Sequence, residues 1–187
     1  MPNNFDLSLF RLFNSLVGKN HLVDLFLIFC AEYILHVIGL GVVIFIAWSF
    51  LPRQKSSRKY NLFFVFYALL SASVSRFFIT ELIRLFYYRP RPFVVFPAMV
   101  QLVAHDTAGS FPSGHATFLF ALATAVFFRY RKTGILLFLA AFLVGVGRVA
   151  TGLHWPTDIV GGALIGILTA VSLRYGLKEV LKKSGSF

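Results

Sequence analysis

Five long apolar runs, separated by short polar segments, dominate the chain. They cover about residues 22–50, 61–88, 112–128, 134–150 and 156–175. A helix needs roughly 20 apolar residues to cross the hydrocarbon layer of a bilayer. The pattern therefore predicts an all-α, polytopic membrane bundle with about five transmembrane helices.

A shorter amphipathic segment precedes these runs, at about residues 5–17. Apolar side chains recur there at helical spacing, with Asp6, Arg11 and Asn14 between them. The segment is too short to span the bilayer, so it predicts an N-terminal helix lying in the membrane interface.

Composition agrees with a membrane protein, because 58% of the 187 residues are hydrophobic and only 13% are charged. Five spans leave little chain for a second module, so we expect a single domain over residues 1–187. Cys30 is the one cysteine in the sequence, which excludes an intrachain disulfide and a cysteine metal cage.

The net charge of +11 is distributed in short clusters between the apolar runs, which argues against a nucleic-acid-binding face. Basic clusters at residues 53–59 and 129–132 and at Lys178, Lys182 and Lys183 favour one cytoplasmic side. With five spans, the N-terminus and the loops at 89–111 and 151–155 then lie outside. The candidate chemistry of the chain falls on that outer face.

Three separated segments bring phosphate-binding residue types to this face. Arg84, Arg91 and Arg148 provide guanidinium groups that bind phosphate oxygens bidentately. Ser113 and Gly114 open a predicted helix, whose free N–H groups and dipole favour an anion. Together they predict a cradle for a phosphoryl group.

Two histidines could divide the catalytic roles. His154 and Asp158 are four residues apart, so on a helix beginning near His154 the carboxylate could accept a bond from one ring nitrogen. The other nitrogen would be free to attack phosphorus, and His115 could protonate the departing oxygen.

A magnesium site is the chief chemical alternative for a phosphate substrate. The chain has only seven acidic residues, and Asp158 is the sole one within these segments. An octahedral magnesium cage is therefore not expected, and we predict no metal or other cofactor.

The three segments resemble the signature of the type 2 phosphatidic acid phosphatase superfamily. They read Arg84-x6-Arg91-Pro92, Pro112-Ser113-Gly114-His115 and Gly147-Arg148-x5-His154-x3-Asp158. The resemblance implies a metal-independent phosphatase that forms a phosphohistidine on His154, oriented by Asp158, with His115 as the general acid. Arg84, Arg91, Arg148, Ser113 and Gly114 would hold the phosphate.

Two positions depart from the superfamily pattern. Arg84 replaces a lysine, which keeps the charge but changes the reach and the donor geometry. Gly147 replaces a serine, which removes one hydroxyl from the expected phosphate pocket.

The short chain, the segment Ala31-Glu32-Tyr33 and the lead-in Ser110-Phe111-Pro112 resemble the bacitracin-resistance type of undecaprenyl-diphosphate phosphatases. This implies hydrolysis of the polyprenyl diphosphate carrier at the outer side of the bacterial inner membrane, with a cytoplasmic C-terminus. Two alternatives are a phosphatase of phosphatidic acid or phosphatidylglycerol phosphate, and a non-catalytic lipid transporter that uses the same cations.

Other polar residues have simpler interpretations. Arg89 lies outside the signature and is expected to contact headgroups or gather anionic substrate. Glu32 is expected to pair with a buried cation such as Arg76, with a role in the substrate path as the alternative.

The segment His105-Asp106 is expected in a solvated loop, although assistance in diphosphate binding is the alternative. The spacing Gly162-x3-Gly166 predicts close helix packing within the fold.

Overall fold

The computed structural model describes the backbone of residues 2–183 and the side chains of residues 2–177. All regular elements in this part are helical, which confirms the predicted all-α class. The predicted basic cluster at Lys178, Lys182 and Lys183 lies outside the described side chains.

The first two apolar runs each form one long helix with a π-helical turn inside it. The first consists of α2 (His21–Ile28), η1 (Phe29–Tyr33) and α3 (Ile34–Ser49). The second consists of α4 (Arg58–Ser73), η3 (Val74–Ile79) and α5 (Thr80–Phe86). A short 3-10 turn, η2 (Pro52–Gln54), lies between them. The π turns were not predicted, and such turns occur frequently at functional sites.

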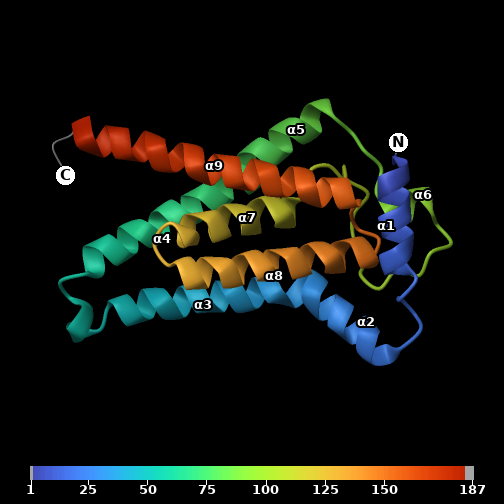
Figure 1. Ribbon diagram of the computed structural model, residues 1–187, viewed down its shortest axis with the longest axis horizontal. Helices are drawn as coiled ribbons and strands as arrows, with labels where there is room; N and C mark the ends of the chain where they lie inside the picture. The colour runs from blue at the N-terminus through green and yellow to red at the C-terminus, as the bar shows by residue number, and fades with distance from the viewer. Residues whose placement is uncertain (1, 184–187) are drawn as a thin grey trace.

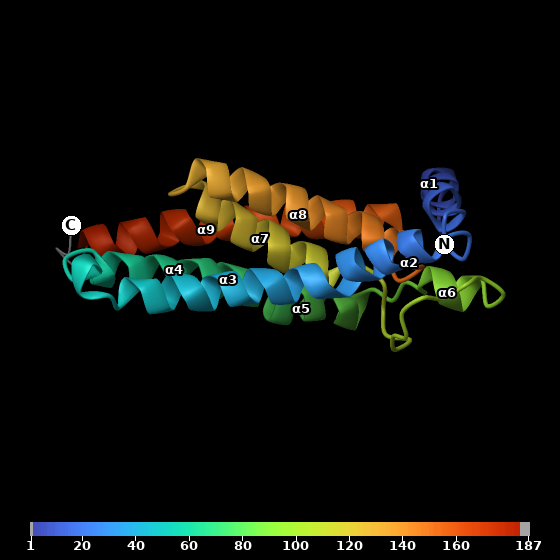
Figure 2. The same ribbon diagram turned by 90° about the horizontal axis from the view of Figure 1, so that it is seen from below.

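The remaining runs form α7 (Gly114–Phe127), α8 (Arg131–Ala150) and α9 (Pro156–Lys183). By length and composition four helices can cross a bilayer: His21–Ser49, Arg58–Phe86, Arg131–Ala150 and Pro156–Leu177. Figures 1 and 2 show α7 enclosed by the longer helices. Most of its residues are buried, so this shorter apolar helix can be screened from lipid by its neighbours.

Small residues let α9 approach α7 closely. A Cβ atom on Gly162 would lie 2.8 Å from the carbonyl oxygen of Ser113, and one on Gly166 would lie 2.8 Å from the backbone nitrogen of Ala121. The predicted role of this glycine pair in packing within the fold is confirmed.

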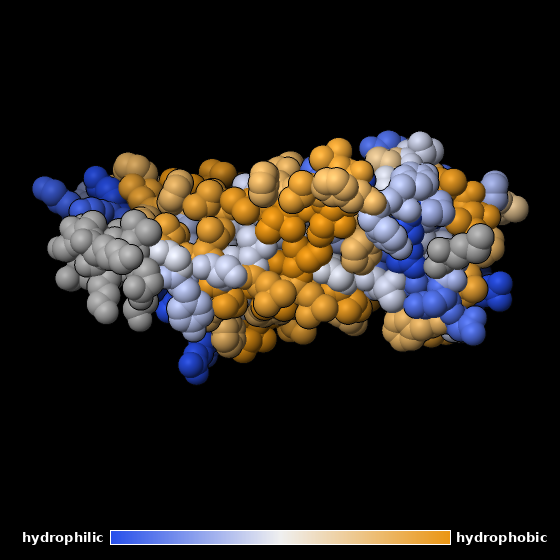
Figure 3. All heavy atoms as spheres, turned by 90° about the horizontal axis from the view of Figure 1, so that it is seen from above, coloured by the Kyte–Doolittle hydropathy of each residue, from blue (hydrophilic) through white to orange (hydrophobic). Residues whose placement is uncertain are grey.

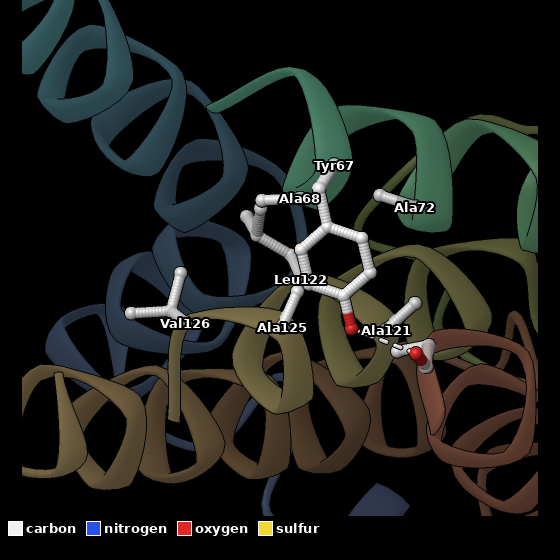
Figure 4. Close-up of a cluster of buried hydrophobic side chains, with 8 residues drawn as sticks. Tyr67, Ala68, Ala72, Ala121, Leu122, Ala125 and Val126 are labelled. Carbon is white, nitrogen blue, oxygen red and sulfur yellow. Dashed lines mark hydrogen bonds between the residues drawn. The ribbon is translucent and has the colours of Figure 1, made fainter. Parts of the chain in front are cut away.

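A buried cluster joins α4, α7 and α9 in the half of the bundle away from the polar loops (Figure 4). The hydroxyl of Tyr67 donates a 2.7 Å hydrogen bond to the carbonyl oxygen of Ala170. This bond satisfies the one polar atom of a buried tyrosine and fixes α4 against α9.

The N-terminal helix α1 (Asn4–Asn14) runs across one end of the bundle, near the short helix α6 (Pro92–Val95) (Figures 1 and 2). Phe10 packs against Trp155 at a centroid distance of 5.5 Å. Asp6 of this helix is completely buried in the protein, which the interfacial pattern of the sequence did not indicate.

The exterior shows an apolar band between two polar ends (Figure 3). Large hydrophobic side chains of the long helices are widely exposed there, among them Leu40, Phe77, Leu139 and Leu164. Such a belt would be unstable in water and is the surface that a bilayer solvates. The chain is an integral membrane protein.

The α7–α9 contact generates a stability prediction. Gly166→Ala should lower the free energy of unfolding by about 1–3 kcal/mol, because the methyl group meets the backbone of α7. Gly39→Ala is the matched control, since a Cβ there meets nothing within 4 Å. Thermal unfolding in detergent measures both variants, and equal stability of the two would contradict the close contact.

Candidate active site

The polar site lies at the end of the bundle where α7 and α9 begin. The backbone N–H of Ser113 donates a 3.1 Å hydrogen bond to the carbonyl oxygen of Asp158, which joins the two helix starts. Arg84, at the end of α5, donates a 3.0 Å bond to the carbonyl oxygen of Pro112. Segments far apart in the sequence therefore meet here.

Two of the three signature arginines are almost fully buried. Arg91 donates to the carbonyl oxygens of Ala108 at 2.9 Å and Leu153 at 3.0 Å. Arg148 donates to Glu32 at 2.7 Å. Burial and the charge of Arg84 lower the pKa of Arg91 to about 10, which still leaves it protonated at neutral pH.

Several buried polar atoms at this end have no hydrogen-bond partner among the described residues. They include the hydroxyl of Ser113 and the Nε atoms of Arg84 and Arg148. Burying a polar group without a partner is costly, so unpaired atoms of this kind call for a specific reason. All three belong to residues predicted to bind phosphate, whose oxygens would satisfy them.

His154 lies in the turn between α8 and α9 and is 1% exposed. Its Nδ1 lies 2.9 Å from the carbonyl oxygen of Ser110, an acceptor, so Nδ1 carries the proton. Nε2 then presents a lone pair, 3.4 Å from Nη1 of Arg91. Burial lowers the pKa of His154 to about 3, so the ring is neutral at neutral pH.

Asp158 does not make the predicted direct bond to His154, because its Oδ2 lies 3.7 Å from Nδ1. His154 precedes the first residue of α9, Pro156, so its ring lies close to the carboxylate but beyond hydrogen-bond distance. Oδ2 instead accepts from the backbone N–H of Trp155 at 2.8 Å and from the hydroxyl of Ser110. Ser110 thus contacts both the carboxylate and the imidazole.

Arg89 has a structural partner that the sequence did not indicate. Its guanidinium is buried and joins Oδ1 of Asp158 to Oδ2 of Asp6. Asp6 also accepts a 2.9 Å bond from the backbone N–H of Thr157. Burial lowers the pKa of Arg89, but the two carboxylates outweigh this effect and raise it overall. The predicted headgroup role of Arg89 is therefore wrong.

His115 is the second residue of α7 and lies partly exposed at the same end of the bundle. Arg148 and His154 are near enough to act on its ring electrostatically. The structure therefore places the two predicted catalytic histidines at the same end of the bundle, where the Ser113–Asp158 backbone bond joins their segments.

Glu32 pairs with Arg148 and not with Arg76, whose partner is Glu81. The pairing itself was predicted, but its partner was wrong, because the π turn η1 aims Glu32 at α8. The same contact explains Gly147, since a Cβ there would lie 2.8 Å from the backbone nitrogen of Ala31. The serine of the superfamily pattern does not fit this packing.

The loop residues His105 and Asp106 lie over the arginines, so the predicted solvated loop is only partly correct. Asp106 is exposed but lies 3.6 Å from Nη2 of Arg91. Nε2 of His105 lies 3.4 Å from Nη2 of Arg148. Burial and the charge of Arg91 lower the pKa of His105, which favours its neutral form.

A helical membrane protein that gathers buried guanidinium groups, a helix N-terminus and a neutral imidazole at one end is suited to phosphoryl chemistry. The family model described as the PAP2 superfamily matches residues 62–180. The chain belongs to this superfamily, as its signature segments predicted.

Known relatives agree in fold and sequence. The chain is 30% identical to the bacitracin transport permease protein BcrC of Bacillus licheniformis, over 90% of this chain and 79% of that protein. It is 32% identical to the undecaprenyl-diphosphatase BcrC of Bacillus subtilis, over 86% of this chain and 78% of that protein. The crystal structure of Aquifex aeolicus LpxE matches with a TM-score of 0.65 and 28% identity, over 90% of this chain and 94% of that one.

Asp6 provides a test of the buried ion pairs that link Asp6, Arg89 and Asp158. Asp6→Asn should lower the free energy of unfolding by about 3 kcal/mol, because it breaks a fully buried pair with Arg89. Arg11→Gln, an exposed change on the same helix, should have little effect. Thermal unfolding in detergent compares them, and an Asp6→Asn variant as stable as Arg11→Gln would show that the pair adds no stability.

Proposed function

We propose that this chain is a membrane lipid phosphatase that removes the terminal phosphate of a lipid diphosphate, with undecaprenyl diphosphate as the substrate. The products are undecaprenyl phosphate and inorganic phosphate. The observation that carries the proposal is the set of unpartnered buried donors of Ser113, Arg84 and Arg148 at the same end as His154. The similarity to undecaprenyl-diphosphatase BcrC supports the choice of lipid.

In the proposed mechanism, Nε2 of His154 attacks the terminal phosphorus. A nitrogen–phosphorus bond forms as the bond to the leaving oxygen breaks, and His115 gives that oxygen a proton. Water then attacks the phosphohistidine, with His115 accepting a proton, and releases inorganic phosphate and free His154.

The phosphoryl group gains charge stabilisation from Arg84, Arg91 and Arg148, together with the hydroxyl of Ser113 and the backbone at Gly114. The three guanidinium groups are fixed before the reaction by bonds to the protein backbone. Preorganised donors of this kind need little rearrangement as charge develops in the transition state.

Asp158 acts on the nucleophile through its surroundings. Its carboxylate accepts a hydrogen bond from the hydroxyl of Ser110. The backbone carbonyl of the same residue accepts a hydrogen bond from His154 and so keeps its proton on Nδ1. The negative charge of Asp158 also favours the positive imidazole ring that forms when Nε2 bonds to phosphorus. The catalytic set is therefore His154, His115 and Asp158.

Other lipids and another class of function are the alternatives. Phosphatidic acid or phosphatidylglycerol phosphate would use the same chemistry on a monophosphate. A non-catalytic lipid transporter would use the cations for binding alone, and one relative is named a transport permease. A transporter has no need for a buried neutral imidazole whose proton is held on Nδ1, which favours the phosphatase.

We also propose the arrangement in the membrane. Residues 1–187 form a single domain in which α7 is a fifth span and α1 lies in the interface. The site faces the outer side of the bacterial inner membrane and the C-terminus is cytoplasmic. The exposed basic residues Arg53, Lys55, Arg131 and Lys132 at the opposite end of the bundle support this orientation.

The chemistry is proposed to be independent of metal. The described residues include no cluster of three or more His, Cys, Asp or Glu side chains arranged to hold an ion. The guanidinium groups of the arginines take the place that a metal ion would have beside the phosphate.

The main prediction concerns the nucleophile. Purified protein in detergent with EDTA should release phosphate from undecaprenyl diphosphate faster than from phosphatidate or phosphatidylglycerol phosphate. His154→Gln should reduce release by at least about a thousandfold, whereas the exposed His21→Gln should retain it. Loss of turnover in EDTA would overturn the metal-free mechanism, and a His154→Gln variant that still turns over would overturn the nucleophile.

A second prediction tests His115. His115→Ala should slow lipid diphosphate hydrolysis by about a hundredfold or more, because the leaving oxygen loses its proton donor. Hydrolysis of p-nitrophenyl phosphate should fall far less, since nitrophenolate departs without a proton. Equal losses on both substrates in steady-state assays would argue against the general-acid role.

A further inference from the structure

Arg76 lies against the start of α7, although it has no place in the superfamily signature. It belongs to the π turn η3, which lies between α4 and α5 in the second long helix. A Cβ atom on Gly114 would collide with Nε, Cδ and Cζ of Arg76. The guanidinium therefore packs on the residue that precedes His115.

The charge of Arg76 belongs to the same cationic site as the signature arginines. Its Nη1 pairs with Glu81, which also lies 3.3 Å from Nη1 of Arg84. Arg76 is near enough to act electrostatically on His115, Arg84, Arg91 and Arg148. It is thus a fourth cation beside a phosphate site for which the signature supplies three.

The position of Arg76 can be related to the direction of the reaction. In an in-line displacement, the leaving oxygen lies on the side of phosphorus opposite the nucleophile. His154 is the proposed nucleophile and His115 the proposed acid, so the leaving oxygen lies next to His115. In a diphosphate this oxygen carries the inner phosphate, whereas in a monophosphate it carries carbon.

We infer that Arg76 binds the inner phosphate of the substrate and makes the site selective for lipid diphosphates over lipid monophosphates. The inference rests on the proposed function and names a residue that would set its substrate class. The guanidinium is partly exposed, with 28% of its side chain accessible, so it can meet a ligand. The leaving lipid phosphate keeps its negative charge, and a cation beside it stabilises both the bound substrate and the departing group.

The test compares two substrates with the same tail, farnesyl diphosphate and farnesyl phosphate. Arg76→Gln should lower kcat/KM for the diphosphate by about tenfold or more, the usual size of one lost charge-assisted hydrogen bond. The monophosphate value should change by less than about twofold, because it places no anion at Arg76.

Three variants serve as controls. Arg76→Lys should recover part of the diphosphate activity, since it keeps the charge and loses the planar fork. Arg84→Gln should lower kcat/KM for both substrates by a similar factor, because Arg84 is proposed to hold the transferred phosphate. Arg129→Gln, an exposed change at the opposite end of the bundle, should leave kcat/KM unchanged for both substrates.

Equal losses on both substrates, or no loss on either, with Arg76→Gln would overturn the inference. Calorimetric binding of inorganic pyrophosphate and inorganic phosphate tests it without turnover. The wild-type protein should prefer pyrophosphate, and Arg76→Gln should remove most of that preference. A protein that hydrolyses neither lipid would refute the proposed function, whereas an unchanged pyrophosphate preference in the variant would refute the role of Arg76.

Discussion

The burial of positive charge at one end of the bundle is the constraint on which this structure depends. A guanidinium removed from water needs a counter-charge or a full set of hydrogen-bond acceptors. Five of the seven acidic residues of the chain pair with arginines at this end. They are Asp6, Glu32, Glu81, Asp106 and Asp158. The acidic residues are thus few in number and are largely committed to one site.

These pairings also explain the elements that position the site. The π turn η1 aims Glu32 at Arg148, and η3 brings Arg76 to Gly114. Helix α1 closes the end of the bundle because its Asp6 satisfies both Arg89 and the first turn of α9.

The sequence predicted the helices and the signature residues because both leave local signals. Apolar runs mark the spans, and the spacing of the three motifs marks the phosphate site. The partners of Glu32 and Arg89 could not be predicted, because the pairs join residues 69 to 116 positions apart that only the packing of the helices brings together. Asp158 illustrates the same limit, since the start of α9 at Pro156 decides which groups its carboxylate reaches.

Exposure separates the acidic partners into two groups with different consequences for an anionic substrate. Asp6 and Asp158 are fully buried and cannot turn to water, so their pairs with Arg89 persist when a ligand enters. Glu32, Glu81 and Asp106 have side-chain exposures of 37%, 48% and 69%, and they contact the arginines of the proposed phosphate site. In the proposed function, a phosphate replaces these carboxylates as the acceptor while the carboxylates turn to water. The exposed acids can therefore exchange their arginine partners for a phosphate at small cost, whereas the buried acids hold the surroundings of the proposed nucleophile, His154, in place.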